Sequence, residues 1–321
     1  MTGNIQQLPL YHASHPQPDM TFQQGFFQVS FQAMASDCEL LIDLPEDRIG
    51  MVKHLADIAI REVWRIEQKY SRYLKDNTFH RIHQQSGHWQ EIDEETYRLL
   101  EFADQGWQIS DGLFDLTSGV LRKAWSFNAG DQLPEASVVK ALLADIGWSK
   151  LDYRMVGNRA ELLLPEGMEL DFGGIGKEYA VDRALGLMLA EAQADETSLS
   201  VLVNLGGDMA CSGLRQNGES WKVAIERPDT DASSLALLSL AGGGLATSGD
   251  SRRYLLKDGV RYSHVLNPKT GWPIQNAPRS ITVAAPSCVQ SGLIATLALL
   301  QGDRAEDFLR QTGLRYWLVP A

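Results

Sequence analysis

The sequence is poor in several features that would mark particular classes of protein. Its three cysteines, Cys38, Cys211 and Cys288, are widely spaced and odd in number, which argues against a disulfide framework or a Cys-x-x-Cys metal site. No stretch reaches the ~18 consecutive apolar residues of a membrane span. The net charge of -12 argues against nucleic acid or an anionic membrane as a partner, because neither would be attracted to the surface as a whole.

The overall composition indicates an ordinary globular protein. Hydrophobic residues make up 44% and charged residues 22% of the 321 residues, close to the average of globular domains. Residues 1–22 are polar and contain Pro9, Pro16 and Pro18, without the basic start and apolar run of a signal peptide. We therefore expect a flexible tail over residues 1–22, a single domain over residues 23–321, and a cytoplasmic location.

The spacing of apolar residues predicts both helices and strands. Between residues 49 and 70 they recur at intervals of three and four, which predicts a long helix with one buried face. Other helices are expected over residues 94–109, 134–146, 289–300 and 303–311. Strands are expected over residues 26–31, 39–43, 151–156, 161–164, 201–205, 221–226, 236–240, 253–256, 262–266, 280–284 and 315–319. Runs of strands with few alternating helices indicate the α+β class, with mixed and antiparallel sheets and packed helices.

Neither standard nucleotide-binding motif is present, but one glycine-rich stretch is informative. It reads Asp171-Phe172-Gly173-Gly174-Ile175-Gly176-Lys177-Glu178-Tyr179-Ala180-Val181-Asp182. Together with the strand expected before it, this pattern predicts a strand, a tight loop and a helix. The glycines, the helix start and Lys177 would together suit a phosphate. Such turns also form for packing reasons alone, and both interpretations remain open.

Four further loops gather glycines and small polar residues near the ends of expected strands. They span residues 111–119, 204–208, 242–250 and 263–271. Each alone is typical of a turn, but their number suggests a shared site. In the last loop, His264 could exchange a proton near neutral pH or act as a structural hydrogen-bonding group.

Two other sets of ring side chains allow more than one interpretation. Tyr73 follows the long helix and could either stack on a flat ring or pack in the core. His80, His83 and His88 could resemble a metal cluster, but they lie in a polar stretch that we interpret as a solvated loop.

Taken in order, these segments resemble one family, the FAD:protein FMN transferases of the ApbE type. The matching segments are Ala33-Met34-Ala35-Ser36, Ser71-Arg72-Tyr73, Gly112-Leu113-Phe114-Asp115-Leu116-Thr117, and residues 170–182, 204–208, 246–250 and 263–271. Several motifs in the right order make the resemblance specific, although each motif alone is weak. The resemblance covers residues 31–302 and implies an ApbE-like, T-fold-like architecture.

The resemblance implies an enzyme that splits FAD, attaches FMN through its phosphate to a Thr or Ser hydroxyl of an acceptor flavoprotein, and releases AMP. The positions that match flavin contacts of the family are Met34, Tyr73, Leu113, Phe114, Asp115, Asp171, Lys177 and Leu266. Met34 and Tyr73 would hold flat rings, and Asp171 would accept hydrogen bonds from FAD. As the catalytic pair, Lys177 would supply charge near the nucleotide and His264 would take the proton from the acceptor hydroxyl.

The expected Mg²⁺ site departs from the family pattern. Family members carry an Asp, and a Thr four residues later, on the helix that matches residues 289–300, and a carbonyl of the glycine-rich turn completes the site. Here Thr296 is retained and Gly174 matches the carbonyl donor. Gly292, however, stands where the carboxylate is expected, and Ala295 could offer only another carbonyl. A cation without a carboxylate ligand would be held weakly.

The missing carboxylate leaves three functions open. Asp208 or Asp250 could replace it from another loop, or the FAD diphosphate could hold the metal, and FMN transfer would then be kept. We favour transfer because Lys177, His264 and Thr296 are intact. Loss of catalysis would leave an FAD-binding protein, and water as the nucleophile would make the chain an FAD pyrophosphatase that releases FMN and AMP.

Overall fold

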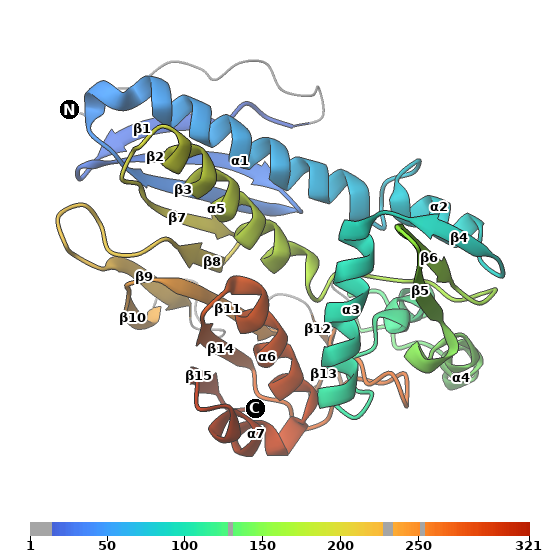
Figure 1. Cartoon of the computed structure of the whole chain (residues 1–321). Coiled ribbons are helices and arrows are strands. Elements are labelled where there is room, and N and C mark those ends of the chain that lie inside the picture. The colour runs from blue at the N-terminus through green and yellow to red at the C-terminus, as the bar shows by residue number, and fades with distance from the viewer. Residues whose placement is uncertain (1–14, 128–130, 227–233, 251–253) are drawn as a thin grey trace.

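The computed structural model describes residues 15–127, 131–226, 234–250 and 254–321, and a large antiparallel sheet forms its centre (Figure 1). The sheet has eight strands in the order β1-β2-β3-β7-β8-β11-β14-β15. These are β1 (Asp19–Gln23), β2 (Phe26–Ala33), β3 (Ser36–Asp43), β7 (Ser200–Leu205), β8 (Asp208–Cys211), β11 (Gly243–Gly249), β14 (Ser280–Ala285) and β15 (Arg315–Val319). Each neighbouring pair is antiparallel. The α+β class is confirmed.

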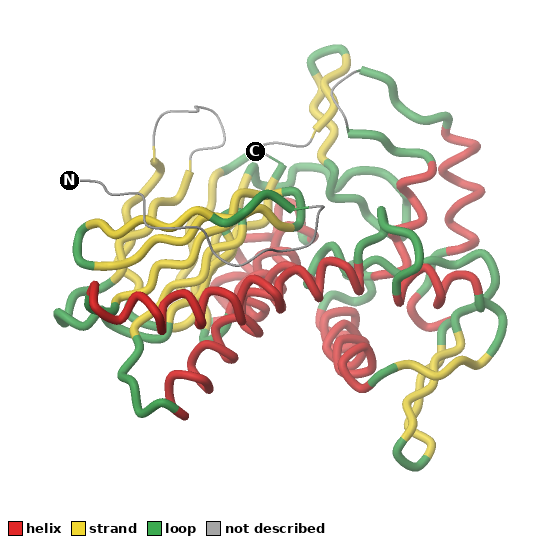
Figure 2. The backbone as a smooth tube through the Cα atoms, turned by 90° about the horizontal axis from the view of Figure 1, so that it is seen from above, coloured by secondary structure: helices red, strands yellow, loops and turns green. Residues whose placement is uncertain are grey.

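Three helices cover one face of this sheet. They are α1 (Ile49–Tyr70), α5 (Gly176–Ala194) and α6 (Cys288–Leu300). Helix α1 packs on α5, α5 packs on β7, β8 and α6, and α6 packs on β11 and β14. Figure 2 shows the strands of the large sheet as one layer with helices along one side of it, and smaller strand pairs apart from it. Among the described helices, none combines the length and apolar character needed to cross a membrane.

The remaining elements surround this core. They are α2 (Thr78–Gln84), β4 (Trp89–Ile92), α3 (Glu94–Ile109), α4 (Ala136–Leu142), β5 (Asp152–Val156), β6 (Arg159–Leu163), β9 (Trp221–Glu226), β10 (Ser234–Leu240), β12 (Tyr254–Lys257), β13 (Val260–Ser263) and α7 (Ala305–Thr312). Short 3₁₀ helices span Glu46–Arg48, Leu116–Lys123, Leu143–Asp145, Trp148–Lys150 and Gly302–Arg304. The smaller sheets pair β9 with β10, β12 with β13, and β6 with both β4 and β5.

The two faces of the large sheet are buried by different elements because side chains alternate along each strand. Phe27 and Val29 of β2 are fully buried among the helices. Leu202 and Leu245 belong to a separate cluster that packs on Trp221 of the β9–β10 hairpin. The sheet is therefore covered on its helical face along its length and partly covered on the other.

Apart from short 3₁₀ helices, the described residues form five elements that the sequence pattern does not predict: β1, α2, β4, β8 and β11. Strand β11 replaces most of the loop expected over residues 242–250. A Cβ at Gly244 would lie 2.3 Å from the backbone nitrogen of Cys288, where α6 begins. Glycine is required there by the close approach of a second backbone rather than by a turn, which is why the composition suggested a loop.

Some expected boundaries also shift. Strand β1 begins at Asp19, inside the tail expected over residues 1–22, and pairs with β2 from Asp19 opposite Ser30 onward. Residues 1–14 and residue 253, the expected start of one strand, lie outside the described residues. The helix expected over residues 134–146 is shorter, because α4 ends at Leu142 and continues as a 3₁₀ turn.

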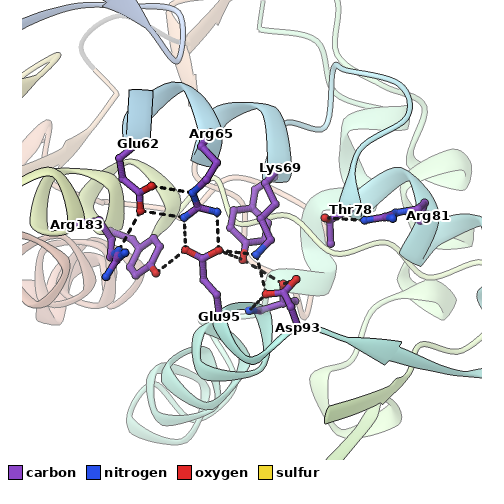
Figure 3. Close-up of polar contacts among 11 residues, drawn as sticks. Glu62, Arg65, Lys69, Thr78, Arg81, Asp93, Glu95 and Arg183 are labelled. Atoms are coloured by element: carbon purple, nitrogen blue, oxygen red, sulfur yellow. Dashed lines mark hydrogen bonds and ion pairs between the residues drawn. The ribbon is translucent and has the colours of Figure 1, made fainter. Parts of the chain in front are cut away.

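An ion-pair network joins α5 to α1 and α3 (Figure 3). Arg65 of α1 contacts Glu62 at 2.7 Å and Glu95 of α3 at 2.5 Å. The Glu95 carboxylate also accepts hydrogen bonds from Lys69 and, at 2.8 Å, from the Tyr179 hydroxyl of α5. Burial alone would raise the pKa of Glu95, but these hydrogen bonds lower it to about 2. The start of α5 is thus attached to two other helices.

We expect Glu95→Gln to lower the free energy of unfolding at pH 7 by about 1–3 kcal/mol, because it removes the charge of a carboxylate that accepts hydrogen bonds from Arg65, Lys69 and Tyr179. The folded pKa lies below the ordinary value of 4.5, so the stabilisation is present above about pH 4.5 and is lost as the pH falls toward 2. Urea unfolding should therefore separate wild type from variant at pH 7 and much less at pH 3. Glu91→Gln, at an exposed position of β4, is the matched control. Equal stability of wild type and Glu95→Gln at pH 7 would contradict the prediction.

Candidate active site

The glycine-rich stretch forms a tight turn that leads into α5, as predicted. The Phe172 carbonyl accepts hydrogen bonds from the backbone N–H groups of Ile175 and Gly176, at 2.9 and 2.7 Å. A Cβ at Gly174 would lie 3.3 Å from the ring of Phe114, so that ring packs closely against the turn. The turn is therefore held by its own backbone and by a side chain from the loop after α3.

Lys177, in the first turn of α5, is paired with Asp208 at the start of β8. The Lys177 Nζ lies 2.6 Å from Asp208 Oδ2, and the other Asp208 oxygen accepts the N–H of Thr247 at 3.2 Å. Burial alone would lower the pKa of Lys177, but the charge and hydrogen bond of Asp208 raise it above its ordinary value. Lys177 therefore remains a cation in a largely enclosed position.

The turn that carries Met34 lies next to Lys177. Met34 and Ala35 are the two central residues between β2 and β3, and their φ angles of 52° and 56° define a type I′ turn. A Cβ at Gly206 would lie 2.7 Å from Ser36 and 3.6 Å from the Lys177 Nζ. Gly206 therefore brings the Met34 turn and Lys177 together, as the resemblance implies.

Asp171 and Tyr73 are joined through Arg72. The Arg72 guanidinium forms an ion pair with Asp171 Oδ2, and the other Asp171 oxygen accepts the N–H of Gly173 at 2.8 Å. Arg72 also donates a 2.8 Å hydrogen bond to the hydroxyl of Tyr73. Tyr73 is 76% exposed, so the core-packing interpretation is wrong, and the Arg72 guanidinium lies over its ring, 5.0 Å from the centroid.

The loop after α3 places Leu113, Phe114 and Asp115 in different surroundings. The carboxylate of Asp115 accepts the N–H groups of Thr117 at 2.8 Å and Trp148 at 2.9 Å, so in this structure it caps the following 3₁₀ helix. Leu113 lines a cavity of about 950 Å³ between residues 109–113 and 267–275. The residues that line this cavity do not include Lys177, Asp208 or Glu178.

His264 and Leu266 follow β13, which ends at Ser263, so the strand expected over residues 262–266 ends earlier and His264 lies between it and the Asn-Pro turn. His264 is half-buried, and its ring centroid lies 6.3 Å from that of Phe127 in an edge contact. Leu266 forms an isolated β-bridge with Pro273 and packs against the cluster that contains Trp125. Their assignments as proton acceptor and flavin contact stay predictions.

Of the expected metal positions, Gly174 lies in the glycine-rich turn, whereas Gly292, Ala295 and Thr296 lie on α6. The Thr296 hydroxyl lies 2.6 Å from the hydroxyl of Ser248, and Ala295 is fully buried. Glu178 of α5 lies against Gly292, is 8% exposed, and has no hydrogen-bond partner for Oε2 among the described residues. Burial, and after it the charge of Asp208, raises the pKa of Glu178.

A Glu in the first turn of a helix is ordinary in sequence, because it favours the helix dipole. The only sequence signal for Glu178 is indirect: the missing side chain at Gly292 leaves space for another group.

The fold and this arrangement of loops define a flavin transferase class, and the sequence profile of the ApbE family matches residues 34–318. The chain belongs to the ApbE family. A Vibrio cholerae protein named FAD:protein FMN transferase is 30% identical over 243 residues, covering 74% of this chain and 70% of the relative. A Haemophilus influenzae protein of the same name is 30% identical over 265 residues, covering 79% and 75%.

Solved structures lead to the same family. The ApbE protein of Thermotoga maritima has a TM-score of 0.80 at 25% identity, covering 92% of this chain and 94% of that one. The apo flavinyl transferase ApbE of Pseudomonas stutzeri has a TM-score of 0.77 at 26% identity, covering 94% and 92%.

The histidine-containing stretch after α1 is only partly the solvated loop that the sequence suggests, because His80 and His83 lie in α2, whereas His88 is exposed in the turn that follows. Asn77 caps helix α2 by accepting the N–H of His80 at 2.8 Å, and this cap is the signal that the sequence reading missed. His83 is half-buried, and its Nε2 accepts the N–H of Leu170 at 2.9 Å. Among the described residues, no three His, Cys, Asp or Glu side chains gather as a metal cluster. His83 therefore supports the chain just before the glycine-rich turn.

We expect His83 to stay neutral until the pH falls to about 4, because burial lowers its pKa and the nearby Arg122 lowers it further. The neutral form is the one that stabilises the fold, so this stabilisation is present above the ordinary value of about 6.5 and is lost as the pH falls toward 4. An NMR titration of the imidazole signals, with the His83 signal assigned by its loss in His83→Gln, measures the midpoint. A midpoint near 6.5 would contradict the assignment.

Proposed function

We propose that this chain is an FAD:protein FMN transferase that acts on a Thr or Ser of an acceptor flavoprotein. Membership of the ApbE family and the names of the relatives support this function. The observation that carries it is the meeting of the Met34 turn, the Lys177–Asp208 pair and helix α6 at one place beside the glycine-rich turn. These are the segments through which the resemblance implies FAD binding.

The charges and rings of the site suit the parts of FAD. Lys177 would face the negative diphosphate, because it is held as a cation beside the backbone N–H groups at the start of α5. The exposed ring of Tyr73 and the side chain of Met34 would hold flat rings. Asp171, already oriented by Arg72 and Gly173, would accept hydrogen bonds from FAD.

The transfer replaces the phosphoanhydride bond of FAD with a phosphate ester bond to the acceptor. The acceptor hydroxyl oxygen bonds to the phosphorus of the FMN half, the bond between this phosphorus and the bridging oxygen breaks, and AMP leaves with that oxygen. His264 takes the hydroxyl proton. The protein's main contribution to such a reaction is to position the groups and to neutralise charge, and Lys177 supplies part of that charge.

The residues around α6 fit a divalent cation, since a buried carboxylate oxygen without a partner and the Thr296 hydroxyl are hard oxygen donors. We propose that Thr296 and the carbonyls of Gly174 and Ala295 help to hold Mg²⁺, which would neutralise diphosphate charge. The cytoplasmic location stays a prediction.

His264→Ala should slow FMN transfer by roughly 10²–10⁴-fold, because the acceptor hydroxyl loses its base, while FAD affinity is retained. The assay mixes protein, FAD, MgCl₂ and a purified acceptor domain, and follows the acceptor mass gain and AMP by mass spectrometry. His54→Ala is the matched control, since His54 is an exposed histidine paired with Glu191.

Unchanged transfer in His264→Ala would contradict its role as the base. No mass gain with wild type would overturn the proposed function. AMP release without acceptor would indicate FAD hydrolysis instead, and FAD binding with no AMP at all would indicate a non-catalytic binding protein.

Lys177→Met should weaken FAD binding by about 1.5–3 kcal/mol, or roughly 10–100-fold, through loss of a charge-assisted contact. Fluorescence titration of FAD measures the dissociation constant. Because this variant leaves Asp208 buried and unpaired, Lys177→Met/Asp208→Asn tests whether binding is lost independently of folding. Lys222→Ala on β9, an exposed lysine, should bind FAD like wild type. An unchanged dissociation constant in both Lys177 variants would refute the contact.

A further inference from the structure

The space beside Gly292 on α6 is filled by a carboxylate from another helix. A Cβ at position 292 would lie 2.6 Å from both Cγ and Oε1 of Glu178, and 2.9 Å from its Cδ. No side chain at position 292 fits while Glu178 holds this conformation. The carboxylate of Glu178 therefore stands within the space that a side chain on this turn of α6 would occupy.

Glu178 is a buried acid that the protein itself leaves incompletely paired. Glu178 is 8% exposed, and its Oε2 has no hydrogen-bond partner among the described residues. Leaving a buried charged oxygen without a partner is costly, and such atoms in a native fold call for an unseen ligand or a functional role.

The surroundings of Glu178 are negative. Asp208 and Glu178 provide two carboxylates, whereas Lys177 provides one positive charge and points to Asp208 at 2.6 Å. A divalent cation at this position would offset the repulsion between the two carboxylates and so favour the ionised form of Glu178.

Hydroxyl oxygens lie on the same side of α6. Thr296 follows Gly292 by four residues, so both occupy one face of the helix. The Thr296 hydroxyl contacts Ser248 of β11 at 2.6 Å, and that contact places two more oxygen atoms on this face. A carboxylate with hydroxyl oxygens is a donor set for a hard divalent cation.

The other two acids suggested by the sequence are already engaged. Asp208 bonds to Lys177 and to the N–H of Thr247. Asp250 contacts Arg261 at 2.8 Å and Arg279 at 3.3 Å. Glu178 is the acid with an unpaired oxygen and direct proximity to Gly292.

We propose that Glu178 of α5 is the carboxylate ligand of the divalent cation at this site, in place of a carboxylate on α6, and that Gly292 makes room for it. The proposal rests on the proposed function for the presence of the diphosphate, which supplies further oxygen ligands. Two consecutive residues in the first turn of α5 would then have different roles. Lys177 neutralises diphosphate charge directly, and Glu178 holds the cation.

The test measures Mn²⁺ binding and does not depend on turnover. Mn²⁺ is titrated into the full chain, with and without FAD, and the loss of the free-ion EPR signal gives the dissociation constant. Glu178→Gln, which keeps the size and removes the charge, should raise this constant at least about tenfold. Glu166→Gln, an exposed acid before the same glycine-rich stretch, should leave it unchanged.

Moving the carboxylate from α5 to α6 tests whether Glu178 is a metal ligand or only a structural residue. Glu178→Ala/Gly292→Asp moves the acid to α6 and should regain most of the Mn²⁺ affinity that Glu178→Ala loses. Gly292→Asp alone places two acids in one space and should lower the melting temperature. Melting temperatures of all variants, measured without metal, show that lost affinity is not lost folding.

Two results would overturn the proposal: no protein-dependent Mn²⁺ binding by wild type in either condition, or an affinity within twofold of wild type in Glu178→Gln. Failure of the proposed function looks different, because Mn²⁺ binding through Glu178 would persist while the acceptor gained no mass. Conversely, if wild type transfers FMN but Glu178→Gln leaves the Mn²⁺ affinity unchanged, the proposed function is retained and Glu178 is not a ligand.

Discussion

The first turn of α5 is the point on which the site depends, because three successive residues there bind three different elements. Lys177 pairs with Asp208 of β8, Glu178 lies against Gly292 of α6, and the Tyr179 hydroxyl donates to Glu95 of α3. Successive residues of a helix point about 100° apart, so one turn can reach three neighbours. This turn fixes the distance between the sheet and two helices, and with it the place where a nucleotide would lie.

Close backbone approach explains why α6 can stand so near this turn. Gly244 lets the start of α6 rest directly on β11, and Gly292 lets the middle of α6 meet Glu178. Asp182, further along α5, accepts the N–H groups of Cys288 and Val289 at 2.9 Å and so caps α6 from the same helix that carries Glu178. Helices α5 and α6 are therefore joined at two places, at Asp182 and at Glu178.

The sequence predicted what is set by local pattern. The apolar stripe of α1 and the loop-to-helix transition at Gly176 were read correctly, because helix periodicity and glycine turns act over a few residues. Strand β11 was missed because its glycines serve contact with α6, which lies some forty residues later. The burial of Glu178 could not be read locally either, since it depends on the absence of a side chain at Gly292. The order of the family motifs indicates that the Met34 turn and Lys177 belong to one site. It does not show which group takes the place of the carboxylate that is missing at Gly292.

The absence of the motif aspartate at position 292 therefore does not mean that a carboxylate is absent from this site. The electrostatic field at a point depends on where a charge lies, and not on which helix carries it. Gly292 removes a carboxylate from α6, yet its lack of a side chain is also what admits the carboxylate of Glu178 from α5. Gly292 and Thr296 share one helix face, so the carboxylate beside Gly292 lies on the same side of α6 as Thr296. Gly292 and Glu178 therefore form one functional unit, and the effect of a substitution at either position depends on the residue at the other.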